Sequence, residues 1–225
     1  PKLGAIKAKI SRCLKGRILS ATVSRTATGK YFVSLCCEEE LIPKPNAKGM
    51  IGIDLGIKEL YVDSSGFHEL NHKYLSKYEQ KLHREQRSLS RMIEVNIAGY
   101  TSDRKPIWKR PLSECSNLQK QKRKIARIHE KIYNCRSDHL HKVSSKLVNE
   151  NQVIALETLN VKGMVRNHHL AKAISDASWS SFVTMLKYKA FEHDCEILKV
   201  PILFPSSQTC SSCGYKNPYV KNLSV

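Results

Sequence analysis

Residues 52–70, GIDLGIKELYVDSSGFHEL, contain the pattern that decides the fold. Residues 50–57 form a short apolar run interrupted by a single acid, Asp54, which is typical of a buried strand. The runs LYVD and FHEL flank a turn signal at Ser65-Gly66 and predict a second and a third strand. We therefore expect three consecutive strands, with Asp54 on the first of them.

Asp54 is a carboxylate within a run that otherwise has the composition of a protein core. An unpaired buried charge is costly, so a compensating partner is expected. A salt bridge to a Lys or Arg is one explanation. The flanking Gly52 and Gly56 favour a second explanation, in which the open strand lets a ligand approach closely.

A second apolar strand, predicted for residues 153–156, ends at Glu157 in a similar way. Two carboxylates on strands about a hundred residues apart in the sequence become neighbours if those strands are adjacent in one sheet. Such a pair, with a third acid, holds two divalent ions about 4 Å apart in enzymes that cleave phosphodiesters. Oxygen ligands of this kind favour Mg²⁺ or Mn²⁺. The sequence therefore predicts a metal site that includes Asp54 and Glu157.

The rest of the chain alternates between strand and helix patterns. Residues 17–25 and 30–39 predict a hairpin, and the breakers Pro43, Pro45 and Asn46 predict a module boundary near residues 43–49. Helical spacing predicts one helix from about residue 73 and a longer one after a loop at residues 96–117. A helix around Trp179 and a strand at residues 195–202 follow. The order strand-Asp, hairpin, helices, strand-Glu matches a ribonuclease-H-like fold.

The charge balance points to a polyanionic partner. The chain has 225 residues, with 38 Lys and Arg against 20 Asp and Glu, and a formal net charge of +18. A positive protein binds nucleic acid favourably because each phosphate that it neutralises releases condensed counterions. A positive surface that only keeps the protein soluble is the alternative explanation of the charge. The two long helices are strongly basic, which fits either solvated faces or contacts to a nucleic-acid backbone. We favour backbone contact and assign it to Lys77, Lys81, Arg84, Arg87, Arg91, Lys120, Arg123, Lys124 and Arg127.

The cysteines suggest a metal site rather than a disulfide framework. Cys210 and Cys213 form a C-x-x-C followed by Gly214, as in a zinc knuckle, which supplies half of the four ligands that zinc needs. Two thiols on a turn without metal are the alternative. The other six cysteines lack a regular spacing, so we expect a reducing, cytoplasmic location, near the nucleoid when the protein is on DNA. No apolar run approaches the roughly 18 residues of a membrane span, and we expect neither a membrane nor a small-molecule partner.

Four stretches carry a resemblance to a known family: GIDLGIKELYVDSSG (52–66), IALETLNVKGM (154–164), AISDASW (173–179) and FPSSQTCSSCGYKNPYVKNLSV (204–225). They resemble the transposon-encoded TnpB family, whose members are RNA-guided DNA endonucleases related to the type V CRISPR effectors. The resemblance implies an α/β fold, with a RuvC-like nuclease domain over residues 49–225 and an incomplete zinc knuckle over residues 204–225. Residues 1–48 would be the C-terminal part of a wedge domain, a small β-barrel.

By the same resemblance, Asp54 and Glu157 are the first two catalytic acids and metal ligands. Cys210 and Cys213 would be the first half of the family's zinc site. The implied cofactors are Mg²⁺ (or Mn²⁺) and Zn²⁺, and the implied partners are a guide RNA and a target DNA. We therefore expect cleavage by two-metal-ion hydrolysis next to a short transposon-associated motif.

The sequence also departs from the family pattern. The family's third acid lies in an Asp-Arg-Asp motif just after a second C-x-x-C, and neither motif occurs in these 225 residues. Asp176 and Asp194 stand in the wrong context to replace it, so we expect the chain to lack part of the active site. Two other functions stay open: a catalytically inactive RNA-guided DNA-binding protein, and a guide-independent transposase or resolvase. Retention of both acids argues against the inactive protein.

Overall fold

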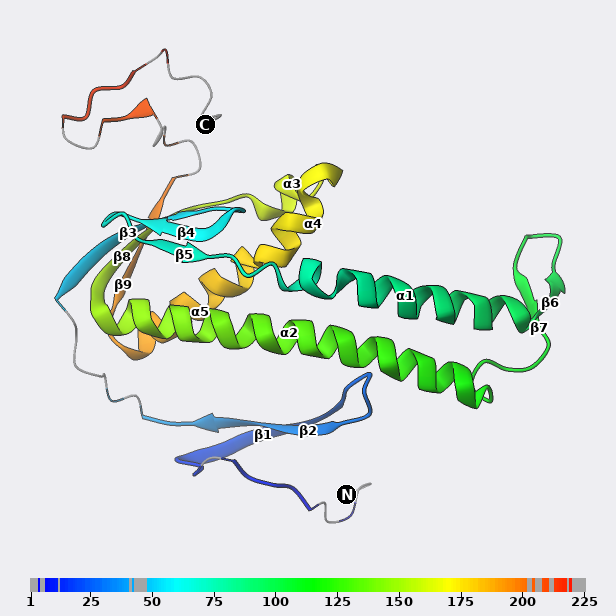
Figure 1. Cartoon of the computed structure of the whole chain (residues 1–225). Coiled ribbons are helices and arrows are strands. Elements are labelled where there is room, and N and C mark those ends of the chain that lie inside the picture. Colours follow the sequence, from blue (N-terminus) through cyan, green and yellow to red (C-terminus); the bar gives the residue numbers. More distant parts are fainter. Residues whose placement is uncertain are drawn as a thin grey trace. The chain divides into compact units, whose positions relative to one another are not determined.

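The computed structural model describes residues 4, 7–11, 13–40, 42, 48–201, 204, 208–210, 213–217 and 219 (Figure 1). The chain packs as two compact units, one of Pro1–Ile42 with Lys73–His139 and the other of Pro43–His72 with Leu140–Val225. The breakers at residues 43, 45 and 46 lie outside the described residues. None of the described helices is long and apolar enough to cross a bilayer.

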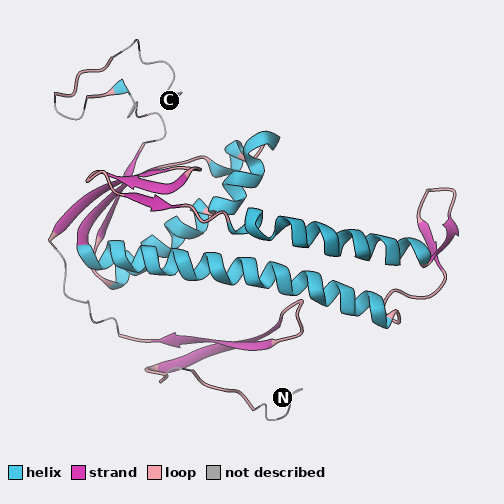
Figure 2. Cartoon of the chain, viewed as in Figure 1, coloured by secondary structure: helices cyan, strands magenta, loops and turns pink. Residues whose placement is uncertain are grey.

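The second unit contains a five-stranded mixed sheet, whose arrows are magenta in Figure 2. Its strands are β3 (Gly49–Leu55), β4 (Glu59–Asp63), β5 (His68–Leu70), β8 (Asn151–Glu157) and β9 (Glu196–Val200). The order is β5-β4-β3-β8-β9, in which β3, β4 and β5 are antiparallel and β3, β8 and β9 are parallel. The three consecutive strands predicted from residues 50–70 are confirmed. An α/β fold with a mixed sheet is confirmed with them.

The core of this unit joins the sheet to helices α2 (Ser116–Glu150), α3 (Val161–Met164), α4 (His168–Ala177) and α5 (Trp179–Glu192). The predicted helix around Trp179 is therefore confirmed. Tyr61 of β4 stacks on Phe182 of α5 with ring centroids 6.1 Å apart. Ile154 of β8 is fully buried in the same cluster. This apolar contact fixes the sheet against α5 and the C-terminal part of α2.

The prediction that Asp54 is buried is wrong. Ile53 and Leu55 are buried, whereas Asp54 between them is exposed. The reason is the two-residue period of a strand, which turns successive side chains to opposite faces of the sheet. The apolar neighbours of Asp54 in the sequence thus pack into the core while its carboxylate faces away from them.

Lys189 of α5 is a buried charge that the sequence pattern did not indicate. Its Nζ donates hydrogen bonds to the carbonyl of His141 at 2.7 Å and to the hydroxyls of Ser144 and Ser145, both at 2.8 Å. Burial lowers the pKa of this ammonium group. Three acceptors for three N–H donors nevertheless satisfy it completely, which explains how α5 tolerates a lysine against α2.

Replacing Ser144 by Ala is expected to lower the free energy of unfolding by about 1–3 kcal/mol, because one buried ammonium donor loses its acceptor. Urea unfolding followed by circular dichroism measures this change. The matched control is Ser90→Ala on the exposed face of α1, which is expected to stay within about 0.5 kcal/mol of the wild type. Equal stability of the two variants would show that Ser144 does not support the ammonium group.

The described part of the first unit contains two β-hairpins and two long helical segments. β1 (Arg17–Arg25) pairs with β2 (Tyr31–Glu38) in antiparallel register, as predicted. Helix α1 (Tyr74–Val95) lies beside α2, and Leu82, Ile128 and Ile132 form the apolar contact between them (Figure 1). The assignment of residues 1–48 to a wedge β-barrel stays a prediction.

The loop predicted for residues 96–117 is only partly a loop. It contains a short antiparallel hairpin of β6 (Ile97–Tyr100) and β7 (Pro106–Trp108). Strands of four and three residues are too short to show the alternation on which sequence assignment depends. Pro106 also argues against a strand in the sequence, but it is tolerated here at the first position of β7.

Candidate active site and nucleic-acid interface

Asp54 and Glu157 are brought together by the pairing of β3 with β8. These strands are parallel neighbours, and Ile53 lies opposite Leu156 in their register. The next position on each strand is Asp54 on β3 and Glu157 on β8. Because in-register residues of parallel strands point to the same face, both carboxylates lie on one face of the sheet at the carboxyl ends of the two strands.

The electrostatics of Asp54 agree with this proximity. Loss of hydration raises the pKa of Asp54, and the negative charge of Glu157 raises it further. A nearby Lys or Arg would lower the pKa of a carboxyl group instead. A salt bridge to a basic residue therefore does not account for Asp54 among the described residues. The arrangement is that of two like charges which a cation would stabilise.

Trp179 fixes the end of the strand that carries Asp54. Its indole Nε1 donates a hydrogen bond of 3.2 Å to the carbonyl of Gly56, two residues after Asp54. The Gly56 amide donates to the carbonyl of Leu60 at 3.2 Å and closes the turn into β4. From the sequence, Trp179 marked only the position of a helix and the end of the family stretch AISDASW. Its hydrogen bond to Gly56 was not apparent from the sequence.

The two glycines that flank Asp54 have different explanations. A Cβ at Gly56 would lie 3.0 Å from the carbonyl oxygen of Glu59, a tight contact, so the turn itself favours glycine there. A Cβ at Gly52 would meet nothing nearer than the Cβ of Ser64 at 3.7 Å, an ordinary contact. The inference that both glycines serve ligand approach therefore fails for Gly56, which has a local steric reason.

The nine basic residues assigned to nucleic-acid contact are all exposed on α1 and α2. A cavity of about 390 Å³ between these helices brings Lys81, Lys124 and Arg127 together, beside Tyr78 and Lys131. A second hollow of about 390 Å³ on α1 is lined by Arg84, Arg87 and Arg91. The remaining residues of the set, Lys77, Lys120 and Arg123, line neither cavity. The set thus forms two basic clusters with three further exposed cations.

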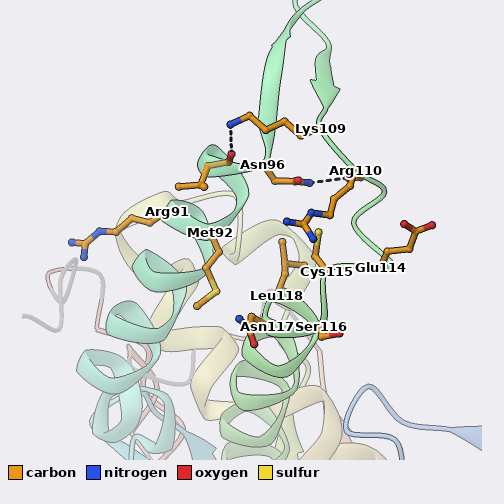
Figure 3. A pocket seen from close by; sticks show the side chains of 11 residues that line it. Arg91, Met92, Asn96, Lys109, Arg110, Glu114, Cys115, Ser116, Asn117 and Leu118 are labelled. Atoms are coloured by element: carbon orange, nitrogen blue, oxygen red, sulfur yellow. Dashed lines mark hydrogen bonds between the residues drawn. The ribbon is translucent and has the colours of Figure 1, made fainter.

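A larger cavity, of about 710 Å³, lies where α1 ends and α2 begins (Figure 3). The amide of Asn96 donates to the carbonyl of Arg110 at 2.9 Å, and Lys109 Nζ donates to the carbonyl of Val95 at 2.8 Å. These bonds tie the β6–β7 hairpin to the end of α1. Figure 3 shows the guanidinium of Arg110 beside Cys115 on the cavity side, whereas Arg91 extends away from it. Its charged lining residues are Arg91, Lys109, Arg110 and Glu114.

The predicted zinc knuckle has the backbone of a tight turn. Cys210 accepts a hydrogen bond from Gly214 N at 2.9 Å, and its own N–H donates to the carbonyl of Tyr215 at 2.9 Å. Gly214 adopts a φ of +72°, which a side chain would disfavour. Cys210 and Cys213 are exposed, and the two serines between them lie outside the described residues. Over the described part of the chain, no group of three or more His, Cys, Asp or Glu is placed to hold a metal. Zinc binding by the two cysteines stays a prediction.

Two family models agree with the resemblance seen in the sequence. A family model described as "Probable transposase" matches residues 34–168, which is more than half of the chain. A model of the Cas12f1-like TNB domain matches residues 179–224. A solved structure, the cryo-EM structure of the Cas12f1-sgRNA-target DNA complex, is 18% identical with a TM-score of 0.45, over 88% of this chain and 45% of that one.

Two curated relatives are similar over most of this chain. One, from Streptomyces pristinaespiralis, is named "Putative RNA-guided DNA endonuclease" and is 36% identical over 87% of this chain and 44% of its own length. The other, from Escherichia coli K12, is named "Putative RNA-guided DNA endonuclease InsQ" and is 31% identical over 96% of this chain and 52% of its own. The chain spans about half the length of these relatives. By the family model that matches more than half of its residues, the chain belongs to the TnpB family of transposon-encoded proteins.

Proposed function

We propose that this chain is the nuclease part of an RNA-guided DNA endonuclease, with Asp54 and Glu157 as two of its metal-binding acids. The observation that carries the proposal is the parallel register of β3 and β8, which places both carboxylates on one face of the sheet. The raised pKa of Asp54 supports it, because after partial loss of hydration the nearby negative charge of Glu157 is its second cause. The names of the curated relatives support the choice of DNA as substrate and RNA as guide.

The residues of the site suit a divalent cation. Carboxylate oxygens are hard ligands that favour Mg²⁺ or Mn²⁺, and a cation would offset the repulsion between Asp54 and Glu157. When bound, two such cations supply an activated water and stabilise the leaving oxygen in a RuvC-type, ribonuclease-H-like site. The pairing of β3 with β8 would hold the carboxylates of Asp54 and Glu157 in position as ligands of that site. Trp179 keeps the end of β3 fixed by its bond to Gly56.

Other parts of the chain would bind and position the nucleic acids. The basic clusters on α1 and α2 would contact the phosphate backbone of the guide and target strands. Base pairing would read the sequence, while the protein would recognise backbone shape and a short transposon-associated duplex motif. Cys210 and Cys213 would contribute two of the four ligands of a zinc ion.

DNA cleavage by the protein assembled with its guide RNA is expected to require both the RNA and a divalent cation. Removal of the cation with EDTA is expected to abolish cleavage, and added Mg²⁺ or Mn²⁺ to restore it. The measurement is cleavage of a plasmid that carries the guide-matched sequence, with a plasmid of unmatched sequence as the control.

Two other results would each contradict the proposal. Specific cutting by RNA-free protein would favour a guide-independent transposase or resolvase, a function that the description of the matching family model also suggests. Guide-dependent DNA binding without cutting under any divalent cation would favour an inactive RNA-guided binder.

A further inference from the structure

Gly52 lies on β3 two positions before Asp54, and the packing of the fold does not require a glycine there. Its backbone does not adopt the positive φ that favours glycine. Among the described residues, a Cβ built at Gly52 would meet only the side chain of Ser64 within 4 Å, at an ordinary contact distance of 3.7 Å. Glycine inside a strand is less favourable than alanine, because it loses more conformational freedom on folding. The reason for this glycine therefore lies outside the packing of the protein.

Gly52 opens onto the same face of the sheet as the two acids. Alternate residues of a strand share a face, so a side chain at Gly52 would point to the side on which Asp54 lies. Ile53 between them is buried in the core on the other face. The register of β3 with β8 is regular from Met50 onward, so no bulge interrupts this alternation. The bare backbone of Gly52 therefore borders the site that Asp54 and Glu157 form.

Ser64, the first residue after β4, lies directly across from Gly52. Its N–H donates to the carbonyl of Gly52 at 2.9 Å, and the N–H of Gly52 donates to Ser64 Oγ at 3.1 Å. These bonds continue the antiparallel register in which Ile53 pairs with Asp63. Residues opposite one another in such a register share a face, so the Ser64 hydroxyl lies beside the acids as well. A hydroxyl that accepts one hydrogen bond still has a proton to donate.

The place of Gly52 and Ser64 on the sheet selects their ligand. Neighbours on one face of a sheet lie about 5–8 Å apart, so both residues are within one such step of Asp54. A nucleic-acid strand carries one phosphate for about every 3.4 Å of helix axis, so a strand cleaved at the acids has its next nucleotide at this distance. Glycine lets a ligand approach the backbone closely, and serine hydroxyls donate to phosphate oxygens.

We propose that Gly52 and Ser64 bind the nucleotide next to the scissile phosphate of the DNA strand. The sugar lies against the bare backbone of Gly52, and the Ser64 hydroxyl donates to the phosphate of that nucleotide. The inference rests on the proposed function, because that function places the scissile phosphate at Asp54 and Glu157. Gly52 and Ser64 position the strand and take no part in breaking the bond.

Replacing Gly52 by Ala is expected to change stability and activity in opposite directions. The variant is expected to unfold at the same urea concentration as the wild type or a higher one. Its guide-dependent cleavage in a single turnover is expected to fall on the order of 10- to 100-fold, because the added methyl group displaces the DNA backbone. The matched control is Gly99→Ala in β6, another strand glycine with open space at its Cβ position. It is expected to keep the wild-type rate.

Two further measurements assign the loss to the position of the DNA. High Mn²⁺ concentration is expected to leave the defect of Gly52→Ala unchanged, whereas it lessens the defect of a variant that has lost a metal ligand. Ser64→Ala is expected to slow cleavage when Gly52 is intact and to add little to Gly52→Ala. The methyl group already excludes the nucleotide that Ser64 binds, so the two losses are not additive.

Wild-type cleavage by Gly52→Ala would overturn the inference, as would a defect that high Mn²⁺ restores or losses that multiply in the double variant. The proposed function can fail separately. If the wild type binds guide-matched DNA without cutting it, the inference requires Gly52→Ala to bind a short single-stranded DNA more weakly than Gly99→Ala does, in the same RNA-loaded protein. A wild type that neither binds nor cuts DNA would overturn both.

Discussion

Replacing Asp54 by Asn, or Glu157 by Gln, is expected to reduce guide-dependent DNA cleavage on the order of 100-fold or more. Each change keeps the shape of the side chain but removes a negative charge from the pair formed by β3 and β8. A site with one carboxylate binds divalent cations more weakly, so the loss is expected to be smaller at high Mn²⁺ concentration. Cleavage in a single turnover measures the chemical step, and a filter-binding assay shows that the guide RNA is still bound.

The control for these variants is Glu196→Gln. Glu196 is an exposed acid of β9 that pairs with Val153, near the end of β8 away from Glu157. This variant is expected to cleave at the wild-type rate. Wild-type cleavage by Asp54→Asn or Glu157→Gln would show that the pair is not the catalytic centre.

Measurements of unfolding show whether the Asp54→Asn protein loses cleavage activity because its carboxylate is missing or because it is less stable. The pKa of Asp54 is raised in the folded state, so that state binds the Asp54 proton more readily than the unfolded chain does. The stability of the wild type therefore falls as pH rises from about the ordinary value of 3.8 through the raised pKa. Asparagine removes this penalty, and without metal the variant is expected to be at least as stable as the wild type at neutral pH.

Replacing Trp179 by Ala is expected to destabilise the protein by about 3–5 kcal/mol, as is typical when a large buried aromatic side chain is removed. Trp179 is only 2% exposed, and it both fills the core of the second unit and bonds to the Gly56 carbonyl. Replacing it by Phe keeps much of the packing but leaves that carbonyl without its indole donor, at an expected cost of about 1–3 kcal/mol. Chemical unfolding measures both changes.

The Phe variant tests whether Trp179 also positions Asp54. We expect Trp179→Phe to slow cleavage at temperatures where it is fully folded, because the turn after β3 loses its anchor. The matched control is Phe182→Leu, a conservative change of a buried α5 residue that has no bond to the turn. If Trp179→Phe cleaves as fast as Phe182→Leu when both are folded, Trp179 contributes to stability alone.

Much of the fold was predictable because its elements have strong local patterns. The meander at residues 50–70 and the long amphipathic helices follow from alternation and from helical spacing. The β6–β7 hairpin was missed because its strands are too short for any periodicity to appear. Lys189 was missed because its burial depends on the three acceptors that α2 presents to it, and no local pattern contains that information.

The candidate site was predictable in its residues but not in its geometry. An acid in an apolar run identified both Asp54 and Glu157, yet the reason given for Asp54, burial, was wrong. The two acids lie close together because of the register between β3 and β8, two strands distant in sequence, and only the folded sheet defines that register. The contact of Trp179 with Gly56 is likewise tertiary, so its role could not be inferred from spacing.

The pairing of β3 with β8 has a consequence for how this site forms and how it can vary. All of α1, the β6–β7 hairpin and α2 lie in the sequence between the two acids. Contacts between such distant segments form slowly, because a long loop must close first, so the acids are expected to meet late in folding. Loop closure becomes only slightly costlier as the loop lengthens. The helical arm between the strands can therefore gain or lose length during evolution, or accept an engineered insert, while the two acids keep their spacing.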